Sequence, residues 1–276
     1  MRAVLKRLIG GLPQPLAVAL RRAACAARSI SGPAADEASQ HRLLWLATSG
    51  YVVSGPFAGT RTIGTSAGSS YSPKILGTYE LELHPLWTVG WLGRFRSLVN
   101  LGCGEGFYLA AIAHLLRSHR QPLPSLSGYD LDRSALAEAR RLLAANGFES
   151  ATLAATGWED ALAAGPGPVL LFCDIEGAEA IVLDPAVVPG LASVAIVCEV
   201  HDDPGSDATK RLLLRRFQAS HHIREFAAQP RTPADFPRVS LCRFDDAGKL
   251  ALMDEHRKRG NNWVLLEPRD FVGTPP

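Results

Sequence analysis

The chain has 276 residues, of which 47% are hydrophobic, so it is long enough to bury a large core. Its net charge of +2 at pH 7 argues against a nucleic-acid partner or an acidic substrate, because both select a strong charge imbalance. The five cysteines show no CxxC spacing, which argues against a disulfide framework or a zinc site and favours a reducing, cytoplasmic setting.

Residues 1–35 form a basic N-terminal extension without an acidic side chain. Pro13 and Pro15 interrupt its apolar part, and arginines stand where a signal peptide needs a small, neutral cleavage region. A solvated helical extension is the favoured interpretation. A transit peptide, or a helix that makes peripheral contact with a membrane surface, stays open.

Residues 36–74 read as a lead-in or cap segment, with a short helix near 41–48 followed by a Gly- and Ser-rich stretch. From about residue 75 to 276, short apolar runs alternate with helical patterns, which is typical of a parallel sheet. We expect an α/β fold with a doubly wound, seven-stranded, mostly parallel sheet. The predicted helices cover 107–118, 134–145, 206–219 and 248–259, and the predicted strands cover 97–101, 126–130, 151–155, 168–173, 193–200, 222–228 and 262–267.

A glycine-rich loop, LVNLGCGEG, lies between the first predicted strand and its helix. Gly102 and Gly104 can adopt backbone conformations closed to other residues and can let a ligand approach the main chain. The dinucleotide fingerprint is GxGxxG, whereas this spacing is GxGxG with Phe107 in place of the last glycine. The loop therefore makes room for a ligand but matches a pyrophosphate poorly, and a plain tight turn remains the alternative.

An acidic side chain ends the second predicted strand. Asp130 stands where a carboxylate can accept hydrogen bonds from both hydroxyls of a ribose. An acid there can also cap the next helix, a role for which Asp132 is better placed. Together, the glycine loop and Asp130 predict an adenosine site.

Four segments, LVNLGCGEG, SGYDLD, LLFCDIEGAE and VCEVHD, resemble the successive motifs of class I S-adenosylmethionine-dependent methyltransferases. CDIEGAE is similar to the D-x-E-G-x-E signature of the FkbM-like family, many of which are O-methyltransferases. The resemblance covers roughly residues 75–267. It implies a Rossmann-like methyltransferase fold with S-adenosyl-L-methionine as cofactor.

The same resemblance implies the cofactor contacts. The main chain of the glycine loop would hold the methionine part, Asp130 the ribose, and Leu131 would lie beside the adenine. Trp158 and Glu159 fall where such enzymes contact the adenine ring, although Trp158 could belong to the core. An upstream segment with Tyr79 and Glu80 would close over the cofactor. The implied cofactor site comprises Tyr79, Glu80, Asn100, Gly102, Cys103, Gly104, Asp130, Leu131, Trp158, Glu159 and Asp174.

Acidic side chains and a histidine follow the fourth and fifth predicted strands. A hydroxyl acceptor must lose its proton, and histidine titrates closest to neutral pH, so His201 is the predicted base. Asp174 or Glu199 would orient this base or the acceptor, and Glu176 completes the predicted catalytic set. The alternative for His201 is a cap of the next helix, beside Asp202 and Asp203.

The motif DIEG has no proline or aromatic residue, which argues against amino methylation of a nucleic-acid base. A divalent metal in the acidic cluster is possible but not favoured, so no metal ligand is predicted. We expect an O-methyltransferase that acts on a hydroxyl of a small molecule or of a sugar or glycolipid. A cofactor-binding protein without turnover and, less favoured, an NAD-type oxidoreductase are the alternatives. The oligomeric state is not predicted.

Overall fold

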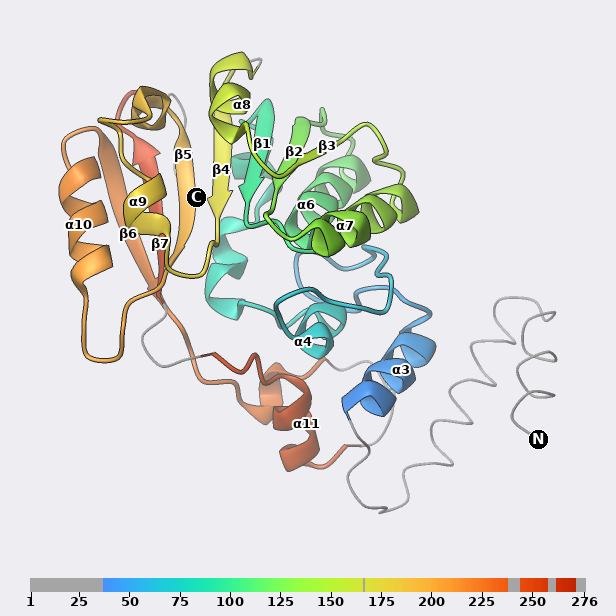
Figure 1. Ribbon diagram of the computed structural model, residues 1–276. Helices are drawn as coiled ribbons and strands as arrows, with labels where there is room; N and C mark the ends of the chain where they lie inside the picture. Colours follow the sequence, from blue (N-terminus) through green and yellow to red (C-terminus); the bar gives the residue numbers. More distant parts are fainter. Residues whose placement is uncertain (1–36, 166, 238–243, 258–261, 272–276) are drawn as a thin grey trace, which may run out of the picture. The chain divides into compact units, whose positions relative to one another are not determined.

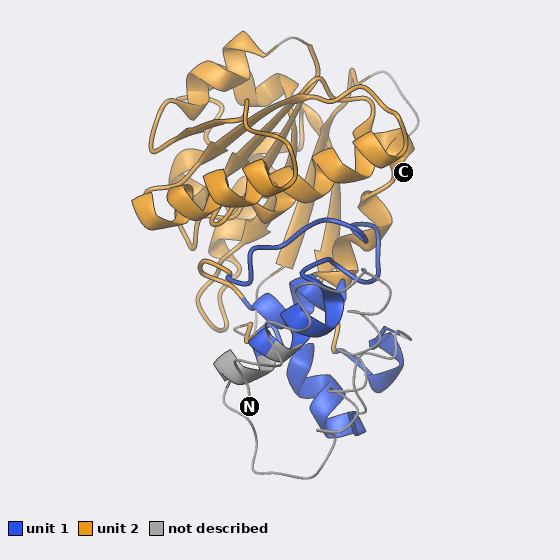
Figure 2. Cartoon of the chain, turned by 90° about the vertical axis from the view of Figure 1, so that its right-hand side faces the viewer, with its two compact units in different colours: residues 1–65, 70–79, 231–255 blue, residues 66–69, 80–230, 256–276 orange. Residues whose placement is uncertain are grey.

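The computed structural model describes residues 37–165, 167–237, 244–257 and 262–271. The predicted basic extension at 1–35 therefore lies outside the described residues. The chain divides into two compact units (Figure 2). Unit 1 comprises residues 1–65, 70–79 and 231–255, and unit 2 comprises residues 66–69, 80–230 and 256–276.

Unit 2 is built on a seven-stranded sheet in the order β3-β2-β1-β4-β5-β7-β6 (Figure 1). The predicted α/β class with a mostly parallel sheet is confirmed, and each predicted strand is present within two residues of its expected bounds. The strands are β1 Ser97–Leu101, β2 Ser125–Tyr129, β3 Thr152–Ala154, β4 Val169–Cys173, β5 Ala195–Val200, β6 His221–Ala227 and β7 Asn262–Pro268.

The first five strands of the sheet are parallel, and β7 runs antiparallel between β5 and β6. Every residue of β4 and β5 is buried, as expected for strands that are covered on both faces. The order reverses between β1 and β4, which lie side by side with Leu101 opposite Cys173. Their carboxyl ends therefore meet at the point where doubly wound sheets bind ligands.

Helices of unit 2 connect the strands. Helix α7, Arg133–Ala145, begins at the cap Asp132, whose side chain accepts from the amide of Ser134, and Asn146 follows its end. The predicted cap and stop signals are confirmed. The other helices are η1 Leu81–Leu86, α5 Val89–Leu92, α6 Phe107–Ser118, α8 Trp158–Ala164, α9 Glu179–Val182, η2 Pro189–Ser193 and α10 Ala208–Phe217.

Unit 1 has a small core of its own, made by residues from both ends of the chain. Its helices are α3 Glu37–Thr48, α4 Tyr71–Leu76, η3 Pro233–Asp235 and α11 Asp246–Leu252. Leu44, Ile75 and Met253 pack together there, and the buried hydroxyls of Thr62 and Tyr71 lie 2.9 Å apart.

The predicted helix at 248–259 is wrong in its second half. Helix α11 ends at Leu252, and the amide of Met253 makes the closing hydrogen bonds. The apolar pattern that favours helix stops at Met253 and is followed by Asp254, Glu255 and His256. Residues 258 and 259 lie outside the described residues. No helix in the described ranges is both long enough and apolar enough to cross a membrane.

Candidate active site

The loops that follow β1 and β4 are locked together at the reversal of strand order. The amide of Asp174 donates to the carbonyl of Leu101 at 3.0 Å. Gly102 has a φ of +72°, and a Cβ built on it would lie 1.6 Å from the carbonyl oxygen of Asp174. Only glycine permits this approach. Gly102 therefore fixes the position of the loop after β4, which carries Asp174 and Glu176 and is called the acidic loop below, relative to the glycine loop after β1, the predicted cofactor loop.

The glycine loop is held by the neighbouring strand β2. The amides of Gly102 and Cys103 both donate to the carbonyl of Tyr129, at 2.8 and 3.0 Å. Gly106 has a φ of +79°, and a Cβ there would lie 3.1 Å from the Cβ of Ala139 in α7. Gly106 therefore allows close packing of α7 against the start of α6.

Asp130 is anchored at the end of β2. One carboxylate oxygen accepts from the amide of Gly104 and the other from the amide of Asp132, each at 2.8 Å. Each oxygen has a second lone pair, so the carboxylate can still accept from two further hydroxyls. Leu131 follows with its side chain 84% exposed. The ribose contact of Asp130 stays a prediction.

The predicted adenine contacts lie at the start of α8. Trp158 is 9% exposed and packs in the main core of unit 2 with Tyr129 and Leu162. The interpretation of Trp158 as a core residue is thus met, while contact of its edge with a ligand stays a prediction. Glu159 is exposed at the same turn.

The remaining predicted cofactor residues are mostly buried. Asn100 lies within β1, and its amide donates to the carbonyl of Phe172 at 3.4 Å. Burial raises the pKa of the Cys103 thiol to about 12, with a smaller contribution from the charge of Asp130. Tyr79 belongs to unit 1, where its ring lies 5.0 Å from the ammonium group of Lys74.

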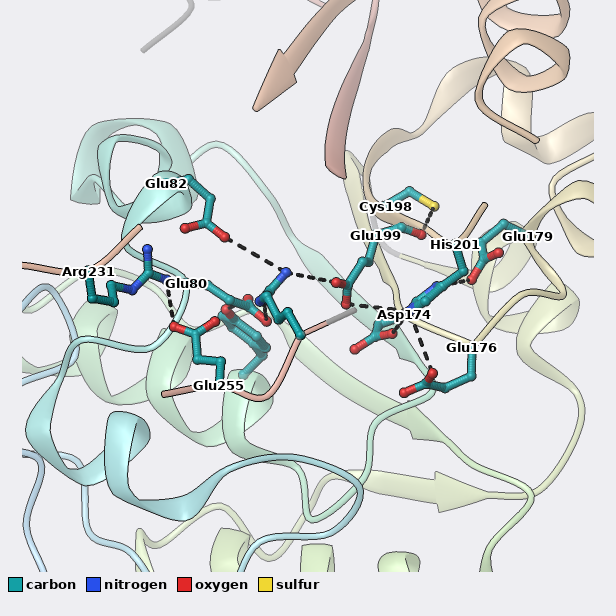
Figure 3. A network of polar contacts seen from close by, with 12 residues as sticks. Glu80, Glu82, Asp174, Glu176, Glu179, Cys198, Glu199, His201, Arg231 and Glu255 are labelled. Atoms are coloured by element: carbon teal, nitrogen blue, oxygen red, sulfur yellow. Dashed lines mark hydrogen bonds and ion pairs between the residues drawn. The ribbon is translucent and has the colours of Figure 1, made fainter. Parts of the chain in front are cut away.

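His201 lies at the centre of a ring of carboxylates (Figure 3). Its Nδ1 donates to Glu179 at 2.8 Å. Its Nε2 lies 3.6 Å from a carboxylate oxygen of Glu176 and 3.8 Å from oxygens of Asp174 and Glu199. The predicted catalytic residues are therefore brought together, but Glu179 orients the ring in place of Asp174 or Glu199.

The charges of this cluster shift its pKa values. Burial opposes the charged imidazolium, but the hydrogen bond to Glu179 and the charge of Glu199 outweigh it and raise the pKa of His201 to about 9. Burial, followed by the charge of Glu199, raises the pKa of Asp174 to about 8. Burial acts to raise the pKa of Glu179, but the hydrogen bonds from His201 and Gly177 outweigh it and lower that pKa. In the arrangement as it stands, His201 is charged at neutral pH.

The helix cap that was the alternative role of His201 is made by its neighbour. Asp202 accepts from the amides of Thr209 and Lys210 at the start of α10, at 2.7 and 3.2 Å. Because Asp202 satisfies these donors, the side chain of His201 is available to the carboxylate cluster.

Sequence reasoning missed two charged residues of this network. The guanidinium of Arg257 lies 2.7 Å from Glu80, 2.7 Å from Glu199 and 3.8 Å from Glu82. Glu80 is fully buried and also accepts a hydrogen bond from the hydroxyl of Tyr108. The alternation of Glu80 and Glu82 in YELELH was the available signal for Glu82.

Among the residues that the structure describes, the connected network has more carboxylates than cations. The cations are Arg257 and His201, and the carboxylates are those of Glu80, Glu82, Asp174, Glu176, Glu179 and Glu199. A mostly buried network with more carboxylates than cations favours a positively charged ligand.

Comparison with known proteins gives low similarity. No protein-family model matches the chain, and no curated protein does. Similar solved structures include a protein named as an rRNA methylase from Clostridium thermocellum, with 13% identity, a TM-score of 0.41, and coverage of 65% of this chain and 92% of that one. Another is the bifunctional kinase-methyltransferase WbdD, with 16% identity, a TM-score of 0.39, and coverage of 64% and 35%.

A third similar structure is a SAM-dependent O-methyltransferase from Thermotoga maritima, with 11% identity, a TM-score of 0.42, and coverage of 68% of this chain and 65% of that one. At such identities and scores, the function of the chain has to be inferred from its own site residues.

Proposed function

We propose that the chain is an S-adenosylmethionine-dependent methyltransferase that methylates a hydroxyl group of a small molecule or of a sugar-bearing acceptor. The observation that carries the proposal is the junction of Gly102 with Asp174 at the reversal of strand order. There the predicted cofactor loop and the acidic loop touch, because Gly102 packs directly against the backbone of Asp174. Ligands of doubly wound sheets bind at this place.

The order of the strands divides the site into two sides. Asp130 follows β2, on one side of the glycine loop, and supports the adenosine end of the cofactor. Glu199 lies at the end of β5, which is β4's other neighbour, and His201 follows that strand; both support the acceptor end. The methyl group would then lie between them, near Asp174. Alignment of donor and acceptor in such a site can contribute roughly 7–11 kcal/mol to catalysis.

The charge of the network favours this cofactor over a nicotinamide dinucleotide. S-adenosylmethionine carries a sulfonium and an ammonium group, whereas a dinucleotide carries an anionic pyrophosphate. The carboxyl groups of Asp174 and Glu176 would attract the former and repel the latter. The glycine spacing supports the same choice, because Phe107 stands where the dinucleotide fingerprint has its last glycine.

The cluster around His201 supports a hydroxyl acceptor, because such an acceptor must lose a proton during transfer. As a simple base, His201 would first have to lose its own proton, since its pKa is raised to about 9. We therefore assign proton removal to the cluster as a whole, with Asp174, Glu176 and Glu199 facing the Nε2 side of the ring.

The proposal is tested by calorimetry with the full-length chain. We expect saturable binding of S-adenosylhomocysteine and none of NAD. Asp130→Ala should weaken that binding at least about tenfold, because it removes a charge-assisted contact with the ribose. Glu149→Gln, which changes an exposed acid between α7 and β3, is the matched control.

Two results would contradict the cofactor assignment: no saturable binding of S-adenosylhomocysteine, or wild-type affinity in Asp130→Ala. Transfer of a labelled methyl group from S-adenosylmethionine into a metabolite extract would then identify the acceptor. Label that survives mild base would exclude a methyl ester, and a methyl ether identified by mass spectrometry of the labelled product would support a hydroxyl acceptor.

A further inference from the structure

Three side chains at the ends of β4 and β5 direct their polar atoms at one small volume. The ligand atoms of Asp174, Glu176 and His201 all lie within 4.8 Å of one another. The His201 Nε2 lies 3.6 Å from Glu176 and 3.8 Å from Asp174. Ligands bound at about 2.0–2.2 Å from a divalent cation stand about 3 to 4.4 Å apart, and both distances from His201 lie in this range.

One oxygen of this cluster lacks any partner that would explain its burial. Oδ1 of Asp174 is buried and accepts no hydrogen bond from the described part of the chain. A buried carboxylate oxygen without a donor destabilises the fold, and such atoms usually indicate an ion or a water. The same oxygen is the one that faces Nε2 of His201.

The ring of His201 is oriented as a metal ligand is. Glu179 is fully buried, and one of its oxygens accepts from Nδ1 of His201 at 2.8 Å and from the amide of Gly177 at 3.0 Å. This bond places the Nδ1 proton on the Glu179 side and leaves Nε2 facing Asp174 and Glu176, where a cation would replace the proton that Nε2 otherwise carries. Histidines that bind metals are commonly held by a carboxylate in this way.

We propose that Asp174, Glu176 and His201 bind one divalent cation, with Glu179 as the positioning residue. An imidazole with two carboxylates favours a first-row transition ion such as Mn²⁺ or Zn²⁺ over Mg²⁺ and Ca²⁺, which prefer oxygen ligands alone. Glu199 is not a ligand in this assignment, because one of its oxygens binds Arg257 at 2.7 Å and the group of ligand atoms within 4.8 Å comprises Asp174, Glu176 and His201.

The exposure of Glu176 gives the site an open side. Its side chain is 73% exposed, whereas those of Asp174 and His201 are 26% and 14% exposed. The role in the reaction rests on the proposed function: an acceptor hydroxyl bound at the open side would lose its proton more readily. His201 is then a ligand and not the base that the sequence predicts, and Glu199, the member of the cluster that is neither a ligand nor the positioning residue, would accept the proton.

Cation binding is measured directly, without turnover. The full-length chain is freed of metal with EDTA and titrated with Mn²⁺, while electron paramagnetic resonance reports the free ion. We expect one saturable Mn²⁺ site per chain. In competition experiments, the affinity for Mn²⁺ should exceed the affinity for Mg²⁺. Glu176→Gln should weaken Mn²⁺ binding at least about tenfold, and Glu179→Gln about 10- to 100-fold.

Asp203→Asn is the matched control, because it removes an exposed charge from the loop of His201 without removing a ligand, and it should leave binding unchanged. Absence of a saturable site, equal affinity in Glu176→Gln, or a preference for Mg²⁺ would each overturn the assignment. Binding of S-adenosylhomocysteine is measured in parallel on the same protein. If the chain binds S-adenosylhomocysteine but not Mn²⁺, the cation site alone is overturned. If it binds Mn²⁺ but not S-adenosylhomocysteine, the proposed function alone is overturned.

Discussion

Replacement of Gly102 by alanine tests whether the two loops at the reversal of strand order form one structural unit. The new Cβ would lie 1.6 Å from the carbonyl oxygen of Asp174, and its nearest acceptable distance is about 3.0 to 3.4 Å. One loop must therefore move by roughly 1.5 Å. Alanine at the φ of +72° adds about 1–2 kcal/mol of backbone strain.

These effects predict a loss of binding and of activity beyond the loss of stability. A displacement of about 1 Å in a reacting group can lower the rate about 100-fold, so methyl transfer should fall at least that much. Affinity for S-adenosylhomocysteine should fall as well, since the clash moves the glycine loop and Asp174 relative to each other. Calorimetry, thermal unfolding and single-turnover methyl transfer measure the three effects.

Gly205→Ala separates the clash from the backbone strain. Gly205 has a φ of +84°, close to that of Gly102, but nothing lies within 4 Å of a Cβ built there. It should lower the melting temperature by about 2–8 °C and leave affinity unchanged. If Gly102→Ala behaved like Gly205→Ala in all three assays, the inferred junction between the loops would be wrong.

Two further predictions concern Arg257 and Cys103. Arg257→Gln should lower the free energy of unfolding by about 3–5 kcal/mol in urea titrations, because it removes the guanidinium that lies 2.7 Å from the buried carboxylates of Glu80 and Glu199. Arg257→Lys should restore part of the loss. A change below about 1 kcal/mol would contradict the inferred network. Cys103, buried and with its pKa raised to about 12, should resist iodoacetamide at pH 8 in the folded chain and react fully in urea, as peptide mass spectrometry can follow. Rapid labelling in the folded state would show that the glycine loop opens.

The fold was largely predictable because its central strands are buried on both faces. The run VLLFC in β4 and the run AIVC at the start of β5 have no charged position, as expected of strands within a covered sheet. The helices that sequence reasoning missed are short: α9 has 4 residues and α8 has 7. Elements of that length show little periodicity, and their position is fixed by tertiary packing.

The candidate site was predictable where its residues belong to one motif. Asp174, Glu176 and Glu179 stand together after β4, and the ends of parallel strands bring Glu199 and His201 beside them. The hydrogen bond between His201 and Glu179 was not predictable, because sequence spacing does not show which carboxylate the imidazole will contact.

Arg257 could not be assigned from its position in the sequence. It contacts Glu80, 177 residues away (257 − 80), from an irregular segment that precedes β7. No local pattern encodes a contact over that separation. The hydrophilic stretch around Arg257 is typical of a solvated helix end, and only the buried carboxylates opposite it explain why a cation is needed there.

The concentration of charge beside β4 and β5 argues for function on its own. Stability alone would favour apolar or neutral side chains at these partly buried positions, since carboxylates that face one another raise the free energy of the folded state. Among the described residues, His201 and Arg257 are the cations that face these carboxylates. Clusters of like charge at partly buried positions are expected where a protein binds a ligand of opposite charge. Around the cluster, the chain supplies most of a binding site for positive charge, and a sulfonium cofactor together with a metal ion would complete it.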